Sequence, residues 1–275
     1  MRLTLLLKIA LCAPALALGA AADAAPEPRA PAGKWNVNFA DAQCVAHREY
    51  GTPENPLRLL LKAPAVGDVV QVAAVRAAAW TEADQVESTV TIDARRPLKT
   101  ELMMFSRKDS KDRVYLWNMP SAEFAAVRQA KTLSVRSSGL NETFALSQME
   151  PLLKVMDECV ADLRRVFNIA QGDADPPALR TRAKPKASLA SLFSDQDYPA
   201  VAVMNNQGGR VGFVLLVGDN GRVADCTIVA TSGVPSLDSQ ACALLKIRAR
   251  FEPARGADGK SARDSLRGGI VWRMQ

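Results

Sequence analysis

Histidine is almost absent from this sequence, because His47 is the single histidine among 275 residues. A zinc centre with several histidine ligands and a Ser-His-Asp catalytic centre both need imidazole, so both are disfavoured. Aromatic residues make up only 5% of the chain, and no two cysteines have the C-x-x-C spacing of a redox or zinc motif. The sequence therefore predicts no metal, no cofactor and no enzymatic activity.

The excess of positive over negative charge in the sequence is also small. The chain has 35 Lys and Arg against 29 Asp and Glu, a net charge of +6. Nucleic-acid binding normally requires a concentrated basic patch. The one local basic stretch runs from Arg180 to Lys186 beside several prolines, which favours a solvated linker. We expect no nucleic-acid partner.

A long apolar run occurs only at the N-terminus. Met1-Arg2 supplies a positive start, Ile9 to Ala22 is almost entirely apolar, and small residues follow. This pattern is typical of a secretory signal peptide over residues 1–25, which predicts a periplasmic mature protein. The alternative is an uncleaved inner-membrane anchor, although Lys8 interrupts the run that such a helix needs.

Four cysteines remain once Cys12 leaves with the signal peptide. They lie in a compartment where disulfides persist, and four cysteines allow three pairings. A segment rich in proline, residues 170–188, predicts a linker between a domain at 26–169 and a second at 189–275. Two cysteines fall on each side of it, which favours the pairs Cys44–Cys159 and Cys226–Cys242.

The first domain reads as a mostly antiparallel sheet followed by a helix, so the predicted fold class is α+β. Ser147 and Glu150 have the spacing of a capping box at the start of that helix. Five apolar residues then repeat every three or four positions on one helical face. They are Leu152, Met156, Cys159, Leu163 and Phe167. The predicted strands are Trp35–Phe39, Cys44–Tyr50, Leu57–Leu61, Val69–Val75, Ser88–Ile92, Leu102–Phe105, Val114–Trp117 and Leu133–Val135.

The second domain predicts the order helix, hairpin, helix, strand. Gly218-Asp-Asn-Gly221 lies between two β-rich runs, Arg210–Val217 and Arg222–Thr231, and is a strong hairpin signal. Ser236 is a candidate N-cap of the following helix, and Asp238 suits its first turn. The last predicted strand is Gly269–Met274.

This order of motifs resembles the C-terminal domain of the TonB family over about residues 192–274. The residues that carry the resemblance are Tyr198-Pro199, Gly209-Arg210-Val211, Asp219-Asn220-Gly221-Arg222-Val223, Ser232-Gly233, Leu237-Asp238 and Arg250-Phe251-Glu252-Pro253-Ala254. The resemblance implies a small αββαβ domain that binds a short extended peptide, the TonB box, of an outer-membrane transporter. It also implies a role in nutrient uptake without catalysis.

The resemblance further implies that the peptide is added to the sheet as a strand. The binding edge would be the last strand, with a second contact zone just before Tyr198. Edge strands also permit a homodimer. An inner-membrane motor complex would be a partner only if the N-terminal segment is uncleaved. The predicted edge residues are Gly269, Ile270, Val271, Trp272, Arg273 and Met274, and those of the second zone are Asp195, Gln196 and Asp197.

Other interpretations remain open at this point. Trp272 either contacts a partner or packs on the helix while nearby arginines blunt the edge. The protein as a whole is alternatively a structural or stress-related envelope protein whose partner is bound by the first domain. His47 and the carboxylates Asp157, Glu158 and Asp162 are expected to be surface or packing residues.

Overall fold

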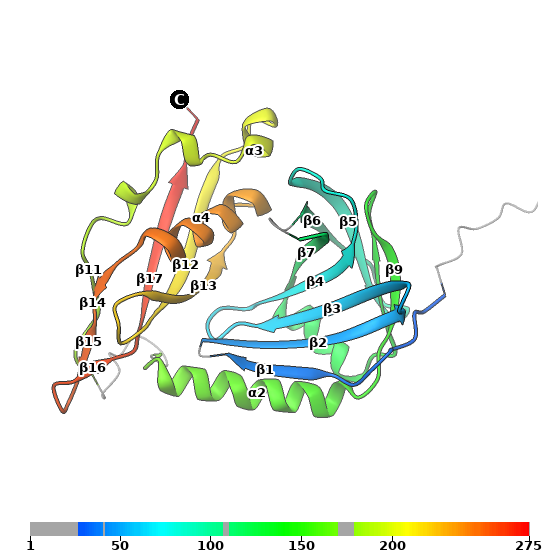
Figure 1. The fold of residues 1–275 in the computed structure, drawn as a ribbon, viewed down its shortest axis with the longest axis horizontal. Coiled ribbons are helices and arrows are strands. Elements are labelled where there is room, and N and C mark those ends of the chain that lie inside the picture. The colour runs from blue at the N-terminus through cyan, green and yellow to red at the C-terminus, as the bar shows by residue number, and fades with distance from the viewer. Residues whose placement is uncertain (1–26, 41, 107–109, 170–178, 275) are drawn as a thin grey trace, which may run out of the picture.

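The computed structural model describes residues 27–40, 42–106, 110–169 and 179–274. They form two units that lie side by side, an N-terminal unit built on a large curved sheet and a smaller C-terminal unit (Figure 1). The predicted signal peptide and the first part of the predicted linker lie outside the described residues. The α+β class is confirmed.

A nine-stranded antiparallel sheet in the order β1-β2-β3-β4-β7-β6-β5-β8-β9 curves into a half-barrel. Successive side chains of each strand point alternately to the inner and the outer face of this sheet. The inner side chains form the larger core, in which Tyr50, Trp117 and Phe144 are fully buried. The strands are β1 Asn36–Ala40, β2 Gln43–Thr52, β3 Asn55–Ala63, β4 Val69–Ala77, β5 Asp84–Ile92, β6 Leu98–Ser106, β7 Asp112–Pro120, β8 Thr132–Arg136 and β9 Asn141–Ala145.

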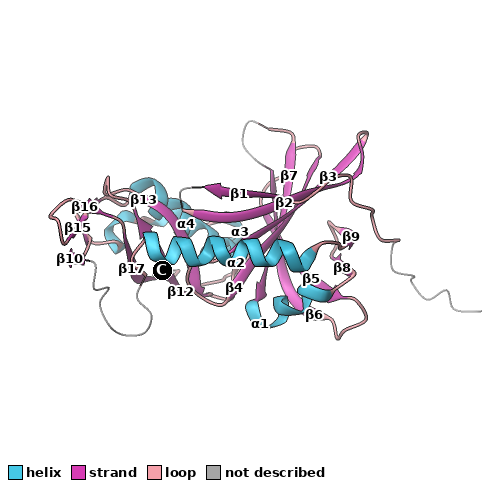
Figure 2. Cartoon of the chain, turned by 90° about the horizontal axis from the view of Figure 1, so that it is seen from below, coloured by secondary structure: helices cyan, strands magenta, loops and turns pink. Residues whose placement is uncertain are grey.

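The helix α2, Met149–Val166, lies along the sheet and closes the half-barrel (Figure 2). Its predicted apolar stripe is confirmed, because all five residues from Leu152 to Phe167 on that stripe are buried. The predicted capping box is wrong: Gln148 is the N-cap, and the Ser147 hydroxyl accepts a hydrogen bond from Arg48. A short helix α1, Ser121–Phe124, and the 3-10 turn η1, Ala125–Gln129, precede β8.

The C-terminal unit has a three-stranded sheet in the order β13-β12-β17, covered on one face by helix α4. The predicted hairpin is confirmed, with Gly221 at φ 72° in the tight turn where a side chain would be strained. The main elements are α3 Ala200–Met204, β12 Gly209–Val217, β13 Val223–Ala230, α4 Pro235–Arg248 and β17 Asp264–Trp272. The small ones are η2 Ala190–Leu192, η3 Asp195–Asp197, β14 Phe251–Glu252, β15 Ala254–Gly256 and β16 Ser261–Ala262.

Several predicted boundaries of this unit need correction. The last strand runs from Asp264 to Trp272 instead of Gly269 to Met274, because its pairing with β12 extends from Val217↔Asp264 to Gly209↔Trp272. The buried Asp264 side chain also accepts hydrogen bonds from Arg182 and Ala183. Ser236 lies inside α4, whose N-cap is Val234. The later part of the predicted linker belongs to this unit. Its strand β10, Leu179–Thr181, pairs with β15, and its strand β11, Lys184–Pro185, pairs with β14.

Both predicted disulfides, Cys44–Cys159 and Cys226–Cys242, are present. Cys44 and Cys159 belong to a third apolar cluster in which the end of α2 packs against Val214 and Leu216 of β12. Asp225 of β13 is also buried there, and it accepts hydrogen bonds from Gln43 and Lys62 of the N-terminal unit and from Lys246 of α4. The two units therefore share an apolar contact and a buried ionic one.

Candidate peptide-binding edge

The strand β17 is the outer edge of the three-stranded sheet. It pairs with β12 in an unbroken antiparallel register from Gly209↔Trp272 to Val217↔Asp264. Among the described residues no strand pairs with its other side. At Ser265 the amide donates to Asp264 and the carbonyl accepts from Arg182. Beyond that residue, alternate backbone N–H and C=O groups of β17 are open to an added strand.

The opposite edge of the same sheet is β13, which faces the N-terminal unit. The residues of β13 line a cavity whose other wall is the outer face of the nine-stranded sheet, including Lys62 and Asn118. Figure 1 shows β17 on the side of its sheet that is remote from the N-terminal unit. Of the two sheet edges, β17 is the one directed away from the N-terminal unit.

Three aromatic rings meet at the end of this edge, and we call them the aromatic cluster: Phe193, Tyr198 and Trp272. The Trp272 ring lies 5.5 Å from Phe193 and 5.3 Å from Tyr198, both in edge-to-face geometry. Trp272 is only 5% exposed, and its Nε1 has no hydrogen-bond partner among the described residues. The alternation of β17 places Trp272 on the α4 side of the sheet, so this side of the edge is apolar.

The segment Asp195–Asp197 precedes the aromatic cluster as the 3-10 turn η3. Asp197 is buried and receives two hydrogen bonds of 2.7 Å from the Arg248 guanidinium of α4. Hydrogen bonds from Arg248 hold the pKa of Asp197 well below its usual range, against the opposing effect of burial, and the Ser194 amide and hydroxyl act in the same direction as Arg248. This ion pair ties η3 to the last turn of α4.

Residues 194–272 match the family model described as Gram-negative bacterial TonB protein C-terminal. The C-terminal unit carries a TonB C-terminal domain. No curated protein matches the chain. The family match supports a TonB-like envelope protein involved in energy transduction for transport, and proteins with this domain generally interact with outer-membrane TonB-dependent transporters.

The structure brings the two predicted contact zones of the TonB C-terminal domain together through the Tyr198–Trp272 contact. Within the edge, Gly269 and Val271 are exposed while Ile270 and Trp272 are buried. Arg273 and Met274 follow the end of β17 and are exposed. Asp195 and Gln196 are exposed, whereas the carboxylate of Asp197 is held by Arg248.

Sequence reasoning missed Phe193 as a neighbour of the edge. A single phenylalanine before Tyr198-Pro199 has no periodic partner, and only the fold brings it to Trp272. The interpretation that Trp272 packs inside the domain is correct for its ring. Its strand remains an open edge, so the two interpretations of Trp272 are compatible.

The Asp197–Arg248 pair predicts an acid-sensitive contribution to stability. The folded-state pKa of Asp197 is depressed, so its contribution is complete above the unfolded pKa of about 4 and is lost as pH falls through the folded value. We expect Asp197→Asn to lower stability at pH 7 and to flatten the acid limb of a pH profile of urea unfolding. Asp195→Asn, at an exposed position of the same turn, is the control, and an equal effect of both variants would contradict this assignment.

The interdomain cleft is the second concave feature of the molecule. It comprises cavities of about 270 Å³ and about 480 Å³ that share Val69, Asn118 and Ile228 in their walls. Polar residues from five neighbouring strands lie in or next to this cleft; four of them line its cavities, and Glu87 is opposite Glu101 in the register. The five residues are Glu87, Glu101, Asn118, Gln71 and Lys62.

Glu101 is the perturbed acid of this group. Its Oε2 is buried without a hydrogen-bond partner among the described residues, and burial, followed by the charge of Glu87 directly opposite, raises its pKa. A raised folded-state pKa costs stability as pH rises above about 4. We expect Glu101→Gln to gain stability relative to the wild type between pH 4 and pH 7.5 in urea unfolding. Glu87→Gln, at an exposed position, should gain less, and identical pH slopes for wild type and Glu101→Gln would refute the effect.

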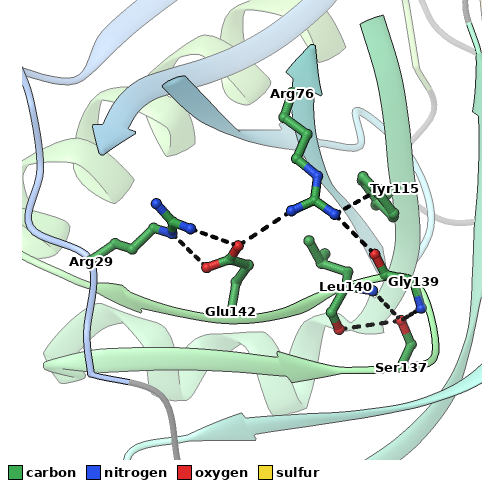
Figure 3. Close-up of polar contacts among 7 residues, drawn as sticks. All are labelled: Arg29, Arg76, Tyr115, Ser137, Gly139, Leu140 and Glu142. Carbon is green, nitrogen blue, oxygen red and sulfur yellow. Dashed lines mark hydrogen bonds and ion pairs between the residues drawn. The ribbon is translucent and has the colours of Figure 1, made fainter. Parts of the chain in front are cut away.

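A second group of charges lies in the N-terminal unit around the buried Glu142 (Figure 3). Glu142 of β9 accepts hydrogen bonds of 2.5 and 3.0 Å from Arg29 and lies 3.5 Å from Arg76, which also donates to Tyr115 and to the Gly139 carbonyl. Arg29 also forms a parallel bridge to Phe144. These contacts fasten the segment before β1 to the sheet, so the cluster acts as a structural tie.

The described part of the chain contains no group of three or more His, Cys, Asp or Glu side chains that could hold a metal ion. None of its helices is long and apolar enough to span a membrane. Asp157, Glu158 and Asp162 lie on the exposed face of α2.

Proposed function

We propose that this protein binds an extended peptide of an outer-membrane transporter, or of an accessory protein, by adding it to the sheet alongside β17. The observation that carries the proposal is the free edge of β17 next to the aromatic cluster. The family match to residues 194–272 supports the choice of a transporter as partner. The protein would act in the periplasm as a binding component of nutrient uptake, without catalysis.

Side-chain contacts must supply much of the affinity. Each backbone hydrogen bond contributes about 0.5–1.5 kcal/mol net, while ordering each peptide residue costs about 1–2 kcal/mol. The free energy gained from backbone hydrogen bonds to β17 is therefore nearly cancelled by the cost of ordering the peptide. The apolar surface of the aromatic cluster and the exposed Val271 offer the contacts that make binding favourable.

The two disulfides support the proposed periplasmic location, since disulfides persist in oxidising compartments. The signal peptide proposed for residues 1–25 would deliver the chain there. An uncleaved segment would instead anchor it in the inner membrane, where the motor complex becomes a partner. N-terminal sequencing of the mature protein distinguishes the two, because Met1 is retained only by the anchored form.

A titration of the isotope-labelled protein with a TonB-box peptide tests the proposal. We expect backbone amide shifts at Gly269, Ile270 and Val271. The control is the same peptide with proline at a central position, which removes a donor and should weaken binding. An absence of shifts in β17 at millimolar peptide, or shifts confined to β13, would overturn the proposal.

One observation favours the alternative in which the N-terminal unit holds the partner. Trp80, in the loop between β4 and β5, is 70% exposed, and exposed tryptophan is enriched at binding hot spots. This alternative predicts a structural or stress-related envelope protein. Loss of partner capture by Trp80→Ser, with unchanged peptide shifts in β17, would support it, and unchanged capture would contradict it.

A further inference from the structure

The two faces of the β17 edge differ in charge. The α4 side carries the aromatic cluster, whereas alternate residues on the other side begin with Arg267 and continue through Gly269 and Val271 to Arg273 beyond the strand end. Arg210 of β12 lies on that same side, because it is opposite Val271 in the register. All three arginines are exposed, and none has a carboxylate partner among the described residues.

Arg210 extends over the edge strand itself. A Cβ atom placed on Gly269 would lie 3.7 Å from Nη2 and 3.8 Å from Nε of Arg210. The guanidinium therefore lies against the backbone of β17 where glycine leaves the surface open. It is available to a strand that pairs with β17, because β17 is the last strand on this side of the sheet.

Two other arginines of the same unit are neutralised by buried carboxylates. Arg248 pairs with Asp197, and Arg182 pairs with Asp264. What sets Arg210, Arg267 and Arg273 apart is that all three lie on one face of the edge. They leave positive charge where an added strand would place every second side chain.

We propose that the peptide bound at β17 is acidic, with carboxylates at alternate positions facing Arg210, Arg267 and Arg273 and apolar side chains facing the aromatic cluster. This inference rests on the proposed function. An exposed ion pair contributes little by itself, but three of them together correspond to roughly a tenfold gain in affinity. Screening by salt should remove this gain, since the Debye length falls to about 3 Å at 1 M salt.

Three capped hexapeptides test the charge preference by calorimetry: alternating valine and glutamate, valine and glutamine, and valine and lysine. We expect the glutamate peptide to bind about tenfold more tightly than the glutamine peptide at low salt, with the lysine peptide weakest. The difference should vanish at 1 M salt. It should also vanish in the variant that combines Arg210→Gln, Arg267→Gln and Arg273→Gln.

A matched control removes the same charge elsewhere in the domain, with Arg180→Gln, Arg222→Gln and Arg255→Gln. All three are exposed, and Arg222 lies at the opposite end of the sheet from Trp272. The control variant should retain the tenfold preference. Equal β17 amide shifts with the glutamate and glutamine peptides would overturn the acidic preference and leave the proposed function intact. No β17 shifts with any peptide, the TonB-box peptide included, would overturn both.

Discussion

Replacing Cys44 and Cys159 together by alanine should lower the free energy of unfolding by about 4–5 kcal/mol. The disulfide closes a chain segment of 115 residues, so its removal releases a large loop-closure entropy in the unfolded state. It also fixes α2 to β2 inside the apolar cluster that contacts Val214 and Leu216 of β12. We therefore expect faster amide hydrogen exchange in β12 as well as a lower urea midpoint.

The second disulfide supplies the matched control. Cys226 and Cys242 are separated by only 16 residues, which corresponds to about 3 kcal/mol in the same treatment. Their replacement by alanine should destabilise the C-terminal unit without changing exchange at the contact between α2 and β12. If the two double variants lose equal stability and show the same exchange pattern, the Cys44–Cys159 bond has no special role in joining the units.

Trp272→Ala is expected to lower the free energy of unfolding by about 3–5 kcal/mol and to abolish peptide binding at β17. The ring is 5% exposed and contacts both Phe193 and Tyr198, so its removal leaves a cavity beneath the edge. The end of β17 would then lose the contacts that hold it in register with Gly209. Urea unfolding and peptide titration measure the two effects separately.

Trp272→Phe separates packing from the indole N–H. Phenylalanine keeps an aromatic ring against Phe193 and Tyr198 but lacks Nε1, which is buried without a partner in the described residues. We expect this variant to recover most of the stability and to bind peptide. Full peptide affinity in a folded Trp272→Ala protein would show that the aromatic cluster does not contribute to the site.

The strands and helices that follow a regular pattern could be predicted from the sequence. The apolar stripe of α2 and the turn at Gly218-Asp-Asn-Gly221 are local patterns, and each is typical of a single kind of element, a helix and a hairpin turn. β9 was missed because Asn141–Ala145 is short and begins with the polar pair Asn141-Glu142. Its Glu142 is buried and pairs with Arg29 and Arg76, both distant in sequence.

The errors share a cause in contacts between distant residues. Ser147 has the spacing of a capping residue, yet its hydroxyl is used by Arg48, 99 residues away in the chain. The composition of residues 179–185 is typical of a linker, but their backbone pairs with β14 and β15. Such pairings override local preference, and one sequence contains no signal for them.

The position of the candidate edge strand could be predicted from the sequence, but the side chains that line its two faces could not. The family resemblance located the last strand, but the free arginines along one face emerge only from the register that sets Arg210 opposite Val271. The role of Asp197 was likewise hidden. Nothing in the sequence near Asp197 indicates that its partner is Arg248, which lies 51 residues later in the chain.

The position of β13 against the interdomain cleft has a consequence for assembly. A small sheet with two open edges can accept a copy of itself at each side and grow into a filament, whereas a sheet with one open edge stops after a single addition. The N-terminal unit removes one of the two growth points of this sheet. If a strand is added at β17 as proposed, a second copy of the chain and a peptide would compete for the same edge.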